Sequence, residues 1–248
     1  NSQATGVNAS TYGQNSVANN VNTTATGQNA VASGANASSS GQGSQASGSN
    51  STSTGQGSTA AGSNSTASGQ GSYAAGANST ATGQYAIAGN VNTTALGQSS
   101  QAFGVNSTAV GVAASATGDK TTALGSNTKV TANNSAAVGS DSVAERGAQT
   151  YRVDIVKEPQ VSVGEVSVGS PGQERQITNV AAGSAPKDAV NMEQLSASNT
   201  RMRKGIASAA ALAGLVPDPR SSDENQVAVS VANFNGENAL AFGYIRRT

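Results

Sequence analysis

The stretch GQGSYAAGANSTATGQ (residues 69–84) decides the fold, because it recurs along the chain in strict register. It resembles GQGSTAAGSNSTASGQ just before it and GQYAIAGNVNTTALGQ just after it. A composition of Gly, Ala, Ser, Thr and Asn is otherwise typical of flexible linkers. A disordered linker would not need to keep the same residue spacing from one repeat to the next, so the repetition indicates an ordered structure.

Glycine marks the repeat at two interleaved sets of positions. The first set recurs every 14 residues, at Gly13, Gly27, Gly41, Gly55, Gly69, Gly83, Gly97, Gly111, Gly125 and Gly139. The second set is Gly6, Gly34, Gly48, Gly62, Gly76, Gly104 and Gly118, and Asn20 and Asn90 fill two of its gaps. Because Asn is the non-glycine residue that best tolerates positive φ, this second set is predicted to occupy left-handed turn positions.

The repeating unit resembles S-x-A-x-G, about seven residues long and used in pairs. A seven-residue period also suggests a coiled coil, but a helix with Gly at every second turn would lose roughly 1 kcal/mol at each one. Alternation instead predicts short strands, with Ser and Ala on one face. Two strands and two turns form one rung of a parallel β-solenoid, and ten rungs at about 4.8 Å stack to roughly 48 Å.

The small face is predicted to point inward and the x positions outward. The inward alanines are Ala18, Ala32, Ala46, Ala60, Ala74, Ala88, Ala102, Ala25, Ala67, Ala81, Ala95 and Ala109. The outward apolar residues are Val17, Val31, Tyr73, Ile87 and Phe103 in one strand series, and Tyr12, Leu96, Val110, Leu124 and Val138 in the other. An exposed apolar strip predicts self-association; which series faces the partner is open at this point.

Charge and chemistry exclude several function classes. Residues 1–118 contain no Lys, Arg, Asp, Glu or His, and all 26 charged residues lie from Asp119 onward. Nucleic-acid binding needs a basic stripe that this region lacks. The chain has neither Cys nor His, so we expect no catalytic site, no metal site and no cofactor. Residue 1 falls inside the repeat and no signal peptide precedes it, which suggests a piece of a longer protein.

The charged part of the chain carries a more specific resemblance. ERQITNVAAGSAPKDAVNMEQL (174–195) resembles the neck of trimeric autotransporter adhesins, and S-x-A-x-G resembles their YadA-like head repeats. KGIASAAALAGL (204–215) and NQVAVSVANFNGENALAFGYIRR (225–247) resemble the start of their membrane anchor. The run at 205–216 is too short to span a bilayer as a helix.

The resemblance implies a homotrimer with an all-β, left-handed parallel β-roll head, a neck and a short α-helical coiled coil. We assign residues 1–141 to the head, 142–189 to the head-to-neck insert and neck, 190–216 to the stalk, and 217–248 to a partial outer-membrane anchor. It also implies a bacterial cell-surface adhesin, anchored in the outer membrane through its complete anchor. Its partners would be host extracellular matrix proteins or cell-surface glycans.

Spacing supports the stalk independently. Residues at alternating steps of three and four form one seam, namely Met192, Leu195, Asn199, Met202, Ile206, Ala209 and Ala213. Family stalks often place Asn in the core, where three copies can bind an anion, so Asn199 is a candidate anion site. The alternative is that Asn199 only sets the register.

Two segments depart from the family pattern. Residues 149–164 make the head-to-neck junction longer than usual, and the alternation of Tyr151, Val153 and Ile155 predicts an extra strand or hairpin. The family's pore uses four strands per chain, whereas only two strand-like segments precede Thr248. Residues 226–247 are therefore expected to be disordered or to pair in some other way.

Three further interpretations concern function. N-x-[ST] sequons recur at Asn8, Asn22, Asn36, Asn50, Asn64, Asn78, Asn92 and Asn106. They suggest either glycosylation or, as we favour, Asn as a turn residue with Ser or Thr starting the next strand. The T-x-T triplets at Thr24, Thr52 and Thr80 resemble those of ice-binding solenoids. A structural or autoagglutinating spacer rod without a ligand is the other alternative to adhesion.

Overall fold

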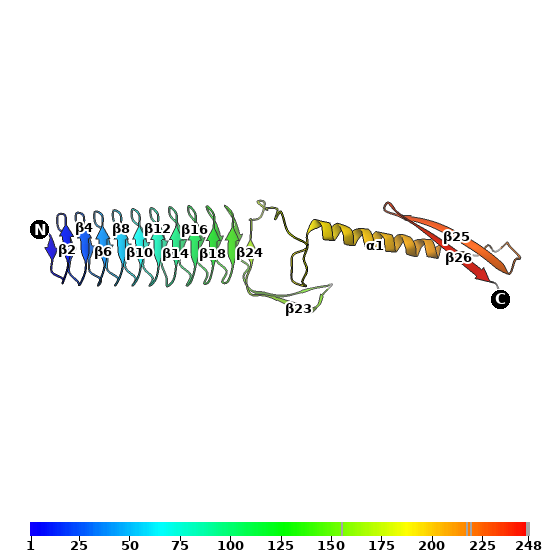
Figure 1. Ribbon diagram of the computed structural model, residues 1–248, viewed down its shortest axis with the longest axis horizontal. Coiled ribbons are helices and arrows are strands. Elements are labelled where there is room, and N and C mark those ends of the chain that lie inside the picture. The colour runs from blue at the N-terminus through cyan, green and yellow to red at the C-terminus, as the bar shows by residue number, and fades with distance from the viewer. Residues whose placement is uncertain (155, 217, 219, 247–248) are drawn as a thin grey trace. The chain divides into compact units, whose positions relative to one another are not determined.

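The structure is a computed structural model that describes residues 1–154, 156–216, 218 and 220–246. The chain divides into two compact units, Asn1–Arg175 and Gln176–Thr248 (Figure 1). Ile155, part of the alternation expected at residues 149–164, lies outside the described residues, as do the last two residues of the expected anchor segment.

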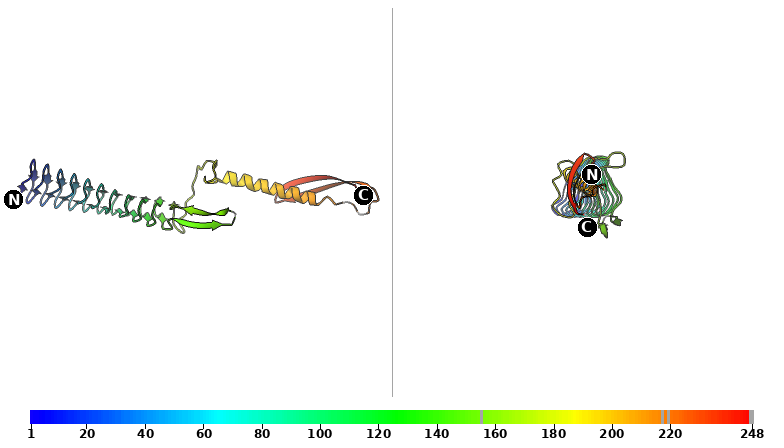
Figure 2. Two further views of the ribbon diagram at one scale, coloured as in Figure 1. Left: turned by 90° about the horizontal axis from the view of Figure 1, so that it is seen from below. Right: turned by 90° about the vertical axis from the view of Figure 1, so that its right-hand side faces the viewer.

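The first unit is a parallel β-solenoid in which each 14-residue rung adds one strand to each of two sheets (Figures 1 and 2). Sheet 1 consists of β1 (Gln3–Ala4), β3 (Val17–Ala18), β5 (Val31–Ala32), β7 (Gln45–Ala46), β9 (Thr59–Ala60), β11 (Tyr73–Ala74), β13 (Ile87–Ala88), β15 (Gln101–Ala102), β17 (Ser115–Ala116), β19 (Lys129–Val130) and β21 (Val143–Ala144). Sheet 2 consists of β2 (Ser10–Tyr12), β4 (Thr24–Thr26), β6 (Ser38–Ser40), β8 (Thr52–Thr54), β10 (Thr66–Ser68), β12 (Thr80–Thr82), β14 (Thr94–Leu96), β16 (Thr108–Val110), β18 (Thr122–Leu124), β20 (Ala136–Val138) and β24 (Val166–Ser167).

The interior is built from small side chains, which confirms the predicted inward face. Every alanine that the alternation places inside is fully buried. The residue two before it is buried as well and is Ser or Thr in most rungs, with Ala30 and Ala86 as the exceptions. In most of these rungs the hydroxyl donates to the carbonyl three residues back, as Ser72 does to Gly69 at 3.0 Å. Val130 is the largest fully buried side chain. Most of the polar interior side chains are therefore hydrogen-bonded within their own turns, which limits the cost of burying them. The Ser51 hydroxyl is the exception, because it is buried without a hydrogen-bond partner among the described residues.

The two glycine sets meet two different demands. Glycines of the first set have φ between +98° and +136°, a conformation that side chains rarely adopt. The second set has no positive φ, so the left-handed prediction for Asn20 and Asn90 is wrong. A Cβ at Gly48 would instead lie 1.9 Å from the carbonyl oxygen of Gly62 in the next rung. Close approach of the backbone, not φ, requires glycine there.

Asn20 and Asn90 replace glycine by using their side chains in the turn. The Oδ1 of Asn20 accepts the N–H of Val21 at 2.8 Å, and its Nδ2 donates to the carbonyl of Ser33 at 2.9 Å. Asn90 makes the same pair of bonds, with Val91 and Phe103. The left-handed position lies two residues later, at Asn22 and Asn92.

A hairpin leaves the solenoid between its last two strands. Strands β22 (Gln149–Val153) and β23 (Val156–Ser162) pair antiparallel, and the chain then re-enters sheet 2 as β24 (Figure 2). This is the hairpin expected at residues 149–164. Both solenoid sheets continue past residue 141, because β21 and β24 add to them.

The second unit contains one helix and a second hairpin. Helix α1 (Met192–Ala213) begins with a capping box, in which Asn191 Oδ1 accepts the N–H of Gln194 and the Gln194 side chain accepts the N–H of Asn191. Strands β25 (Asn225–Phe234) and β26 (Glu237–Arg246) pair antiparallel and pack on α1. Across the part of the chain that is described, no helix has the length and apolar character to cross a membrane.

The second hairpin has a small face and a large apolar face. Small residues such as Ala228, Ala241 and Gly243 alternate with Val229 and Phe242, and the large side chains are exposed. Ala207 and Ala211, the buried residues of α1, supply the helix side of this contact. The two strands thus pair with each other, one of the two outcomes expected for residues 226–247.

Close backbone approach and positive φ predict losses of stability of different size, which Gly62 of the second set and the turn residue Gly57 allow to be compared. Gly62→Ala places a Cβ 2.0 Å from the carbonyl oxygen of Gly76 at an ordinary φ, so we expect a loss of about 3 kcal/mol or more. Gly57→Ala meets nothing within 4 Å and adds only the strain of φ +65°, about 1 kcal/mol. Thermal unfolding followed by circular dichroism measures both. Equal losses would contradict the assignment of the second set to close approach.

Candidate functional site

The surface of the solenoid is the candidate functional site. The described residues contain no group of three or more His, Cys, Asp or Glu side chains that could hold a metal ion. What the solenoid offers is rows of outward side chains, one member per rung. Each row has its own chemistry, set by which position of the repeat it occupies.

Two amide ladders line the turns. In the asparagine ladder, each Nδ2 donates to the Oδ1 of the next rung at 2.9–3.1 Å. Its members are Asn8, Asn22, Asn36, Asn50, Asn64, Asn78, Asn92 and Asn106. In the glutamine ladder, each Nε2 donates to the preceding rung at 2.6–3.1 Å. Its members are Gln14, Gln28, Gln42, Gln56, Gln70, Gln84 and Gln98.

The asparagine ladder settles the role of the sequons in the fold. All eight asparagines have φ between +56° and +58°, and the Ser or Thr two residues later is the first residue of a sheet 2 strand. The prediction of Asn as the turn residue is therefore confirmed. Sequence analysis missed the ladder itself, although Asn and Gln each recurring at 14-residue spacing was the signal for it.

The outer face of sheet 2 carries two ranks of side chains. The first rank is hydroxylic in nine successive rungs: Ser10, Thr24, Ser38, Thr52, Thr66, Thr80, Thr94, Thr108 and Thr122. The second rank is hydroxylic from Thr26 to Thr82 and apolar at Leu96, Val110, Leu124 and Val138. The paired hydroxyls of the T-x-T triplets thus end at β12, so the ice-binding alternative concerns only the first part of the head.

The outer face of sheet 1 is less regular. Val17, Val31, Tyr73 and Ile87 occupy one outward rank, as predicted, but Gln45, Thr59 and Gln101 interrupt it. Phe103 directly follows β15 and is 41% exposed. The apolar residues of this face form separate groups, whereas the apolar part of the second rank on sheet 2 is continuous.

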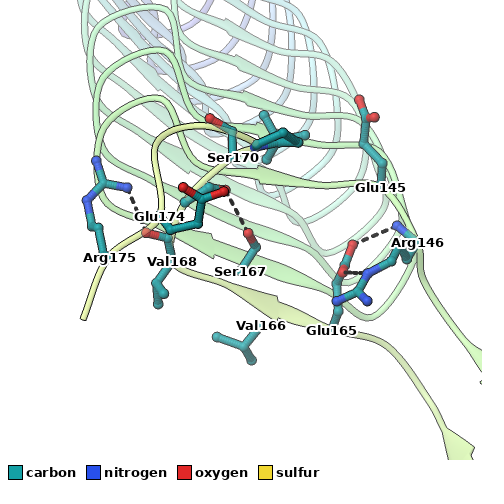
Figure 3. Close-up of a pocket in the computed structure, with 12 residues that line it drawn as sticks. Glu145, Arg146, Glu165, Val166, Ser167, Val168, Ser170, Glu174 and Arg175 are labelled. Atoms are coloured by element: carbon teal, nitrogen blue, oxygen red, sulfur yellow. Dashed lines mark hydrogen bonds and ion pairs between the residues drawn. The ribbon is translucent and has the colours of Figure 1, made fainter. Parts of the chain in front are cut away.

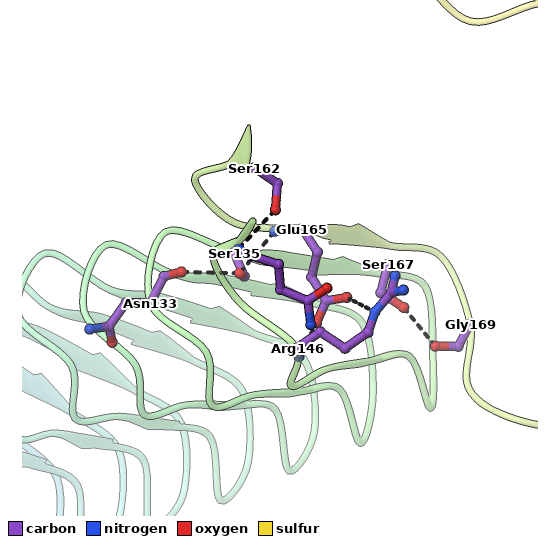
Figure 4. Close-up of polar contacts among 8 residues, drawn as sticks. Asn133, Ser135, Arg146, Ser162, Glu165, Ser167 and Gly169 are labelled. Carbon is purple, nitrogen blue, oxygen red and sulfur yellow. Dashed lines mark hydrogen bonds and ion pairs between the residues drawn. The ribbon is translucent and has the colours of Figure 1, made fainter. Parts of the chain in front are cut away.

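Hydrogen bonds from two arginines close the end of the solenoid at residues 140–175 (Figures 3 and 4). Arg146 donates to Glu165 from its backbone N–H at 2.6 Å and from its guanidinium at 2.9 Å. Arg175 donates to the carbonyl of Val168 at 2.7 Å and to Ser142 Oγ at 3.0 Å. These contacts tie the return strand β24 to the last rung.

The electrostatics of Glu165 follow from its position. Burial alone would raise the pKa of its carboxyl group, but the hydrogen bonds and positive charge of Arg146 outweigh burial and lower it. Beside this pair lies an open hollow of about 570 Å³ that Val143, Val166, Pro171, Glu174 and Arg175 help to line. We interpret this hollow as part of the structure that closes the end of the head and not as a ligand site. Its charged side chains bond to one another or to the backbone.

The predicted stalk seam lies exposed on α1. Met192, Leu195, Met202 and Ile206 are 47–75% exposed, and the Asn199 side chain is partly buried. Ala207 and Ala211, which are buried, lie on a different stripe of the helix. The structure therefore brings the seam residues onto one uncovered face. The anion site at Asn199 stays a prediction.

Comparisons with known proteins match both parts of the chain. The family model described as the YadA head domain repeat matches residues 32–58, 46–71, 67–89, 88–114 and 116–142. The model described as the coiled stalk of trimeric autotransporter adhesin matches residues 176–214. Autotransporter adhesin EhaG of Escherichia coli O157:H7 is 52% identical over 68 residues. That match covers 27% of this chain and only 4% of the length of EhaG.

Two solved structures are also similar. The collagen-binding domain of the Yersinia adhesin YadA matches with a TM-score of 0.45 and 23% identity, over 77% of this chain and 86% of that one. The C-terminal YadA-like domain of a Burkholderia pseudomallei protein matches with a TM-score of 0.34 and 26% identity, over 50% of this chain and 54% of that one.

The lowered pKa of Glu165 predicts acid sensitivity at the end of the solenoid. A carboxyl group whose pKa is lower in the folded state stabilises the fold above its unfolded pKa of about 4.3. This contribution is lost as the pH falls through the folded pKa. Glu165→Gln should therefore lower the melting temperature at neutral pH, and the difference from the unsubstituted protein should shrink at about pH 3.

Glu145→Gln is the matched control for this experiment. Glu145 pairs with Lys129 at 2.7 Å, but both side chains are about half exposed, so its loss should change the melting temperature little. A difference for Glu165→Gln that is the same at both pH values would contradict the role of the carboxylate.

Proposed function

The chain belongs to the trimeric autotransporter adhesins, and we propose that its head binds host extracellular matrix or host cell surfaces as a homotrimer. The supporting observation is the solenoid surface, which is free of charge through residue 118 and repeats hydroxyl and amide groups in register from rung to rung. Adhesins of this family are surface proteins, and the chain spans a small part of the length of EhaG.

The chemistry of the rows defines how such a head would bind. Without charges through residue 118 it cannot attract a partner by long-range fields or hold one by ion pairs. Contacts would come from hydroxyls, amides and exposed apolar groups, each of them weak. Affinity would then come from repetition along each head, over three chains and over many molecules on one cell.

Sheet 2 is the side of the head that we place at the trimer axis. Leu96, Val110, Leu124 and Val138 lie above one another in four successive rungs, and all are partly or largely exposed in the single chain. Parallel copies that meet along their length would bury such a continuous rank. On sheet 1, by contrast, polar residues interrupt the apolar rank.

The second unit would continue the trimer. The seam residues of α1 are exposed on a face that the hairpin β25–β26 leaves uncovered, which suits packing against two copies of itself. We propose residues 190–216 as a stalk segment and residues 217–248 as part of the membrane anchor. The outward Val227, Val229, Val231, Leu240 and Phe242 support the latter, since lipid-facing strands alternate in this way.

The stalk assignment predicts the effect of Leu195→Asp. Three aspartates would meet near the axis, where burying each charge costs several kcal/mol. The variant should dissociate, or melt well below the unsubstituted protein, when its mass is measured by light scattering during size-exclusion chromatography. Ala197→Asp is the control, because Ala197 is exposed and lies outside the seam. A Leu195→Asp protein that stays trimeric with unchanged melting would refute the seam.

The adhesion proposal is tested with the full chain displayed densely on beads. We expect binding to cultured host cells or to at least one immobilised matrix protein, and weak binding of the same protein free in solution. Binding should change little between about 0.05 and about 0.5 M NaCl, because residues 1–118 of the head have no charges to screen. No binding to cells or matrix would favour the spacer rod. Binding that salt abolishes would move the site to the charged residues 142–176.

A further inference from the structure

An aromatic patch interrupts the repeat on the outer side of sheet 1. We define it as Tyr73, Tyr85, Ile87 and Phe103, from three successive rungs. Three of the four aromatic residues among the first 141 residues belong to it. Tyr73, Tyr85 and Phe103 are 43%, 55% and 41% exposed. The patch is the place on the outer side of sheet 1 where aromatic side chains gather; the other large apolar residues of that sheet's outer rank, such as Val17 and Val31, are aliphatic.

Tyr85 occupies a position where a large side chain is costly. Its φ is +57°, and its N–H donates to the carbonyl of Gln70 at 2.9 Å, so the turn imposes the conformation. The equivalent residue is Gly43, Gly57 or Gly71 in the three preceding rungs, and Ser99 and Ala113, both small, have φ +56° there in the next two. Glycine adopts this conformation without strain, and an aromatic residue rarely does. Since the turn gains nothing from the ring, an exposed ring held under strain points to a role outside the fold.

Two rings of the patch rest on glycines of the preceding rung. Cδ1 and Cε1 of Tyr85 lie 2.7 Å from where a Cβ of Gly71 would stand, and Cδ1 of Phe103 lies 2.5 Å from that of Gly89. Any side chain at either glycine would displace the ring. The rings are therefore seated in fixed places, and a ligand that stacks on them need not order them first.

Hydrogen-bonding groups lie beside the rings. Gln84 directly precedes Tyr85 and donates to Gln70 at 2.6 Å within the glutamine ladder. A ladder amide uses one N–H and one acceptor site for its neighbours and keeps a second N–H for other partners. Aromatic faces receive the C–H groups of a sugar ring, and amides bind its hydroxyls. With no charge in residues 1–118, an anionic sugar would find no counter-charge there.

We propose that the aromatic patch binds an uncharged oligosaccharide, with one sugar ring on Tyr85 and its hydroxyls bonded to the side chains of Gln70 and Gln84. This inference rests on the adhesin function proposed above and names a ligand class for the head. The patch does not suit the trimer contact, because parallel solenoids would need an apolar rank that continues over many rungs. Sheet 2 supplies that rank, and the patch is confined to residues 73–103.

The test compares two variants that each restore the residue of a neighbouring rung. Tyr85→Gly matches Gly71 and should keep the fold, with a melting temperature equal to or above that of the unsubstituted protein. Tyr12→Thr matches Thr26 and removes a ring from the other sheet that is 66% exposed, somewhat more than that of Tyr85. The full chain, displayed densely, is tested on poly-N-acetyllactosamine and mannan as neutral glycans, heparin as an anionic glycan, and collagen as a protein.

We expect binding to at least one neutral glycan, at least about tenfold weaker for Tyr85→Gly, and unchanged for Tyr12→Thr. Any of four results would overturn the inference: no binding to the neutral glycans, equal binding by Tyr85→Gly, binding to heparin or collagen alone, or a changed oligomeric mass of Tyr85→Gly. If the chain still binds cells in the absence of glycan binding, only this inference fails. Loss of all binding to cells and matrix would remove the proposed function as well.

Discussion

The close stacking of one rung on the next is the constraint on which the whole head depends. A Cβ at Gly62 would come within 2.0 Å of the carbonyl oxygen of the following rung, so a side chain there would have to displace the backbone. The rungs pair in a constant 14-residue register up to β20 and β21, and only small residues fit between the two sheets. The low apolar content of the chain is thus a consequence of the fold, since a narrow coil has no room for a conventional core.

The spacing of residues in the sequence was sufficient to predict the repeating strands and their buried face. It was not sufficient where two different physical causes favour the same residue type. Alternation in S-x-A predicted the strands and the inward alanines, because a strand has only two faces. Glycine, however, satisfies both a positive φ and a close backbone approach, so the sequence could not tell Gly13 from Gly48. Asn20 led to a wrong prediction of positive φ, because it stands in place of glycine through the hydrogen bonds of its side chain and not through a left-handed backbone conformation. Nothing in the sequence predicted the ion pair of Arg146 and Glu165, because both residues lie in a segment that does not repeat.

The narrow interior buries little apolar surface, so most of the stability of the head has to come from other interactions. Backbone bonds between rungs, the two amide ladders and self-association are the available sources. The ladders resemble the stacked amide rows of cross-β structures, in which identical side chains bond along the stacking axis. The apolar rank of sheet 2 and the seam of α1 are both exposed in the single chain, and the hydrophobic effect favours covering them. Each of the two units of the chain therefore has one exposed apolar surface that association with further copies would bury.

Because the fold fixes only the inward positions and the turns, the outward positions are free to vary from rung to rung without cost to the core. Regular rows then supply many weak, equivalent contacts, while a departure such as Tyr85 can supply one contact of higher specificity. In a trimer, one such departure per chain gives three equivalent copies around the axis. An adhesin with such a surface can gain specificity from the strained, exposed ring of Tyr85. It can gain avidity from the three symmetry-related copies of that ring and from the repeated rows.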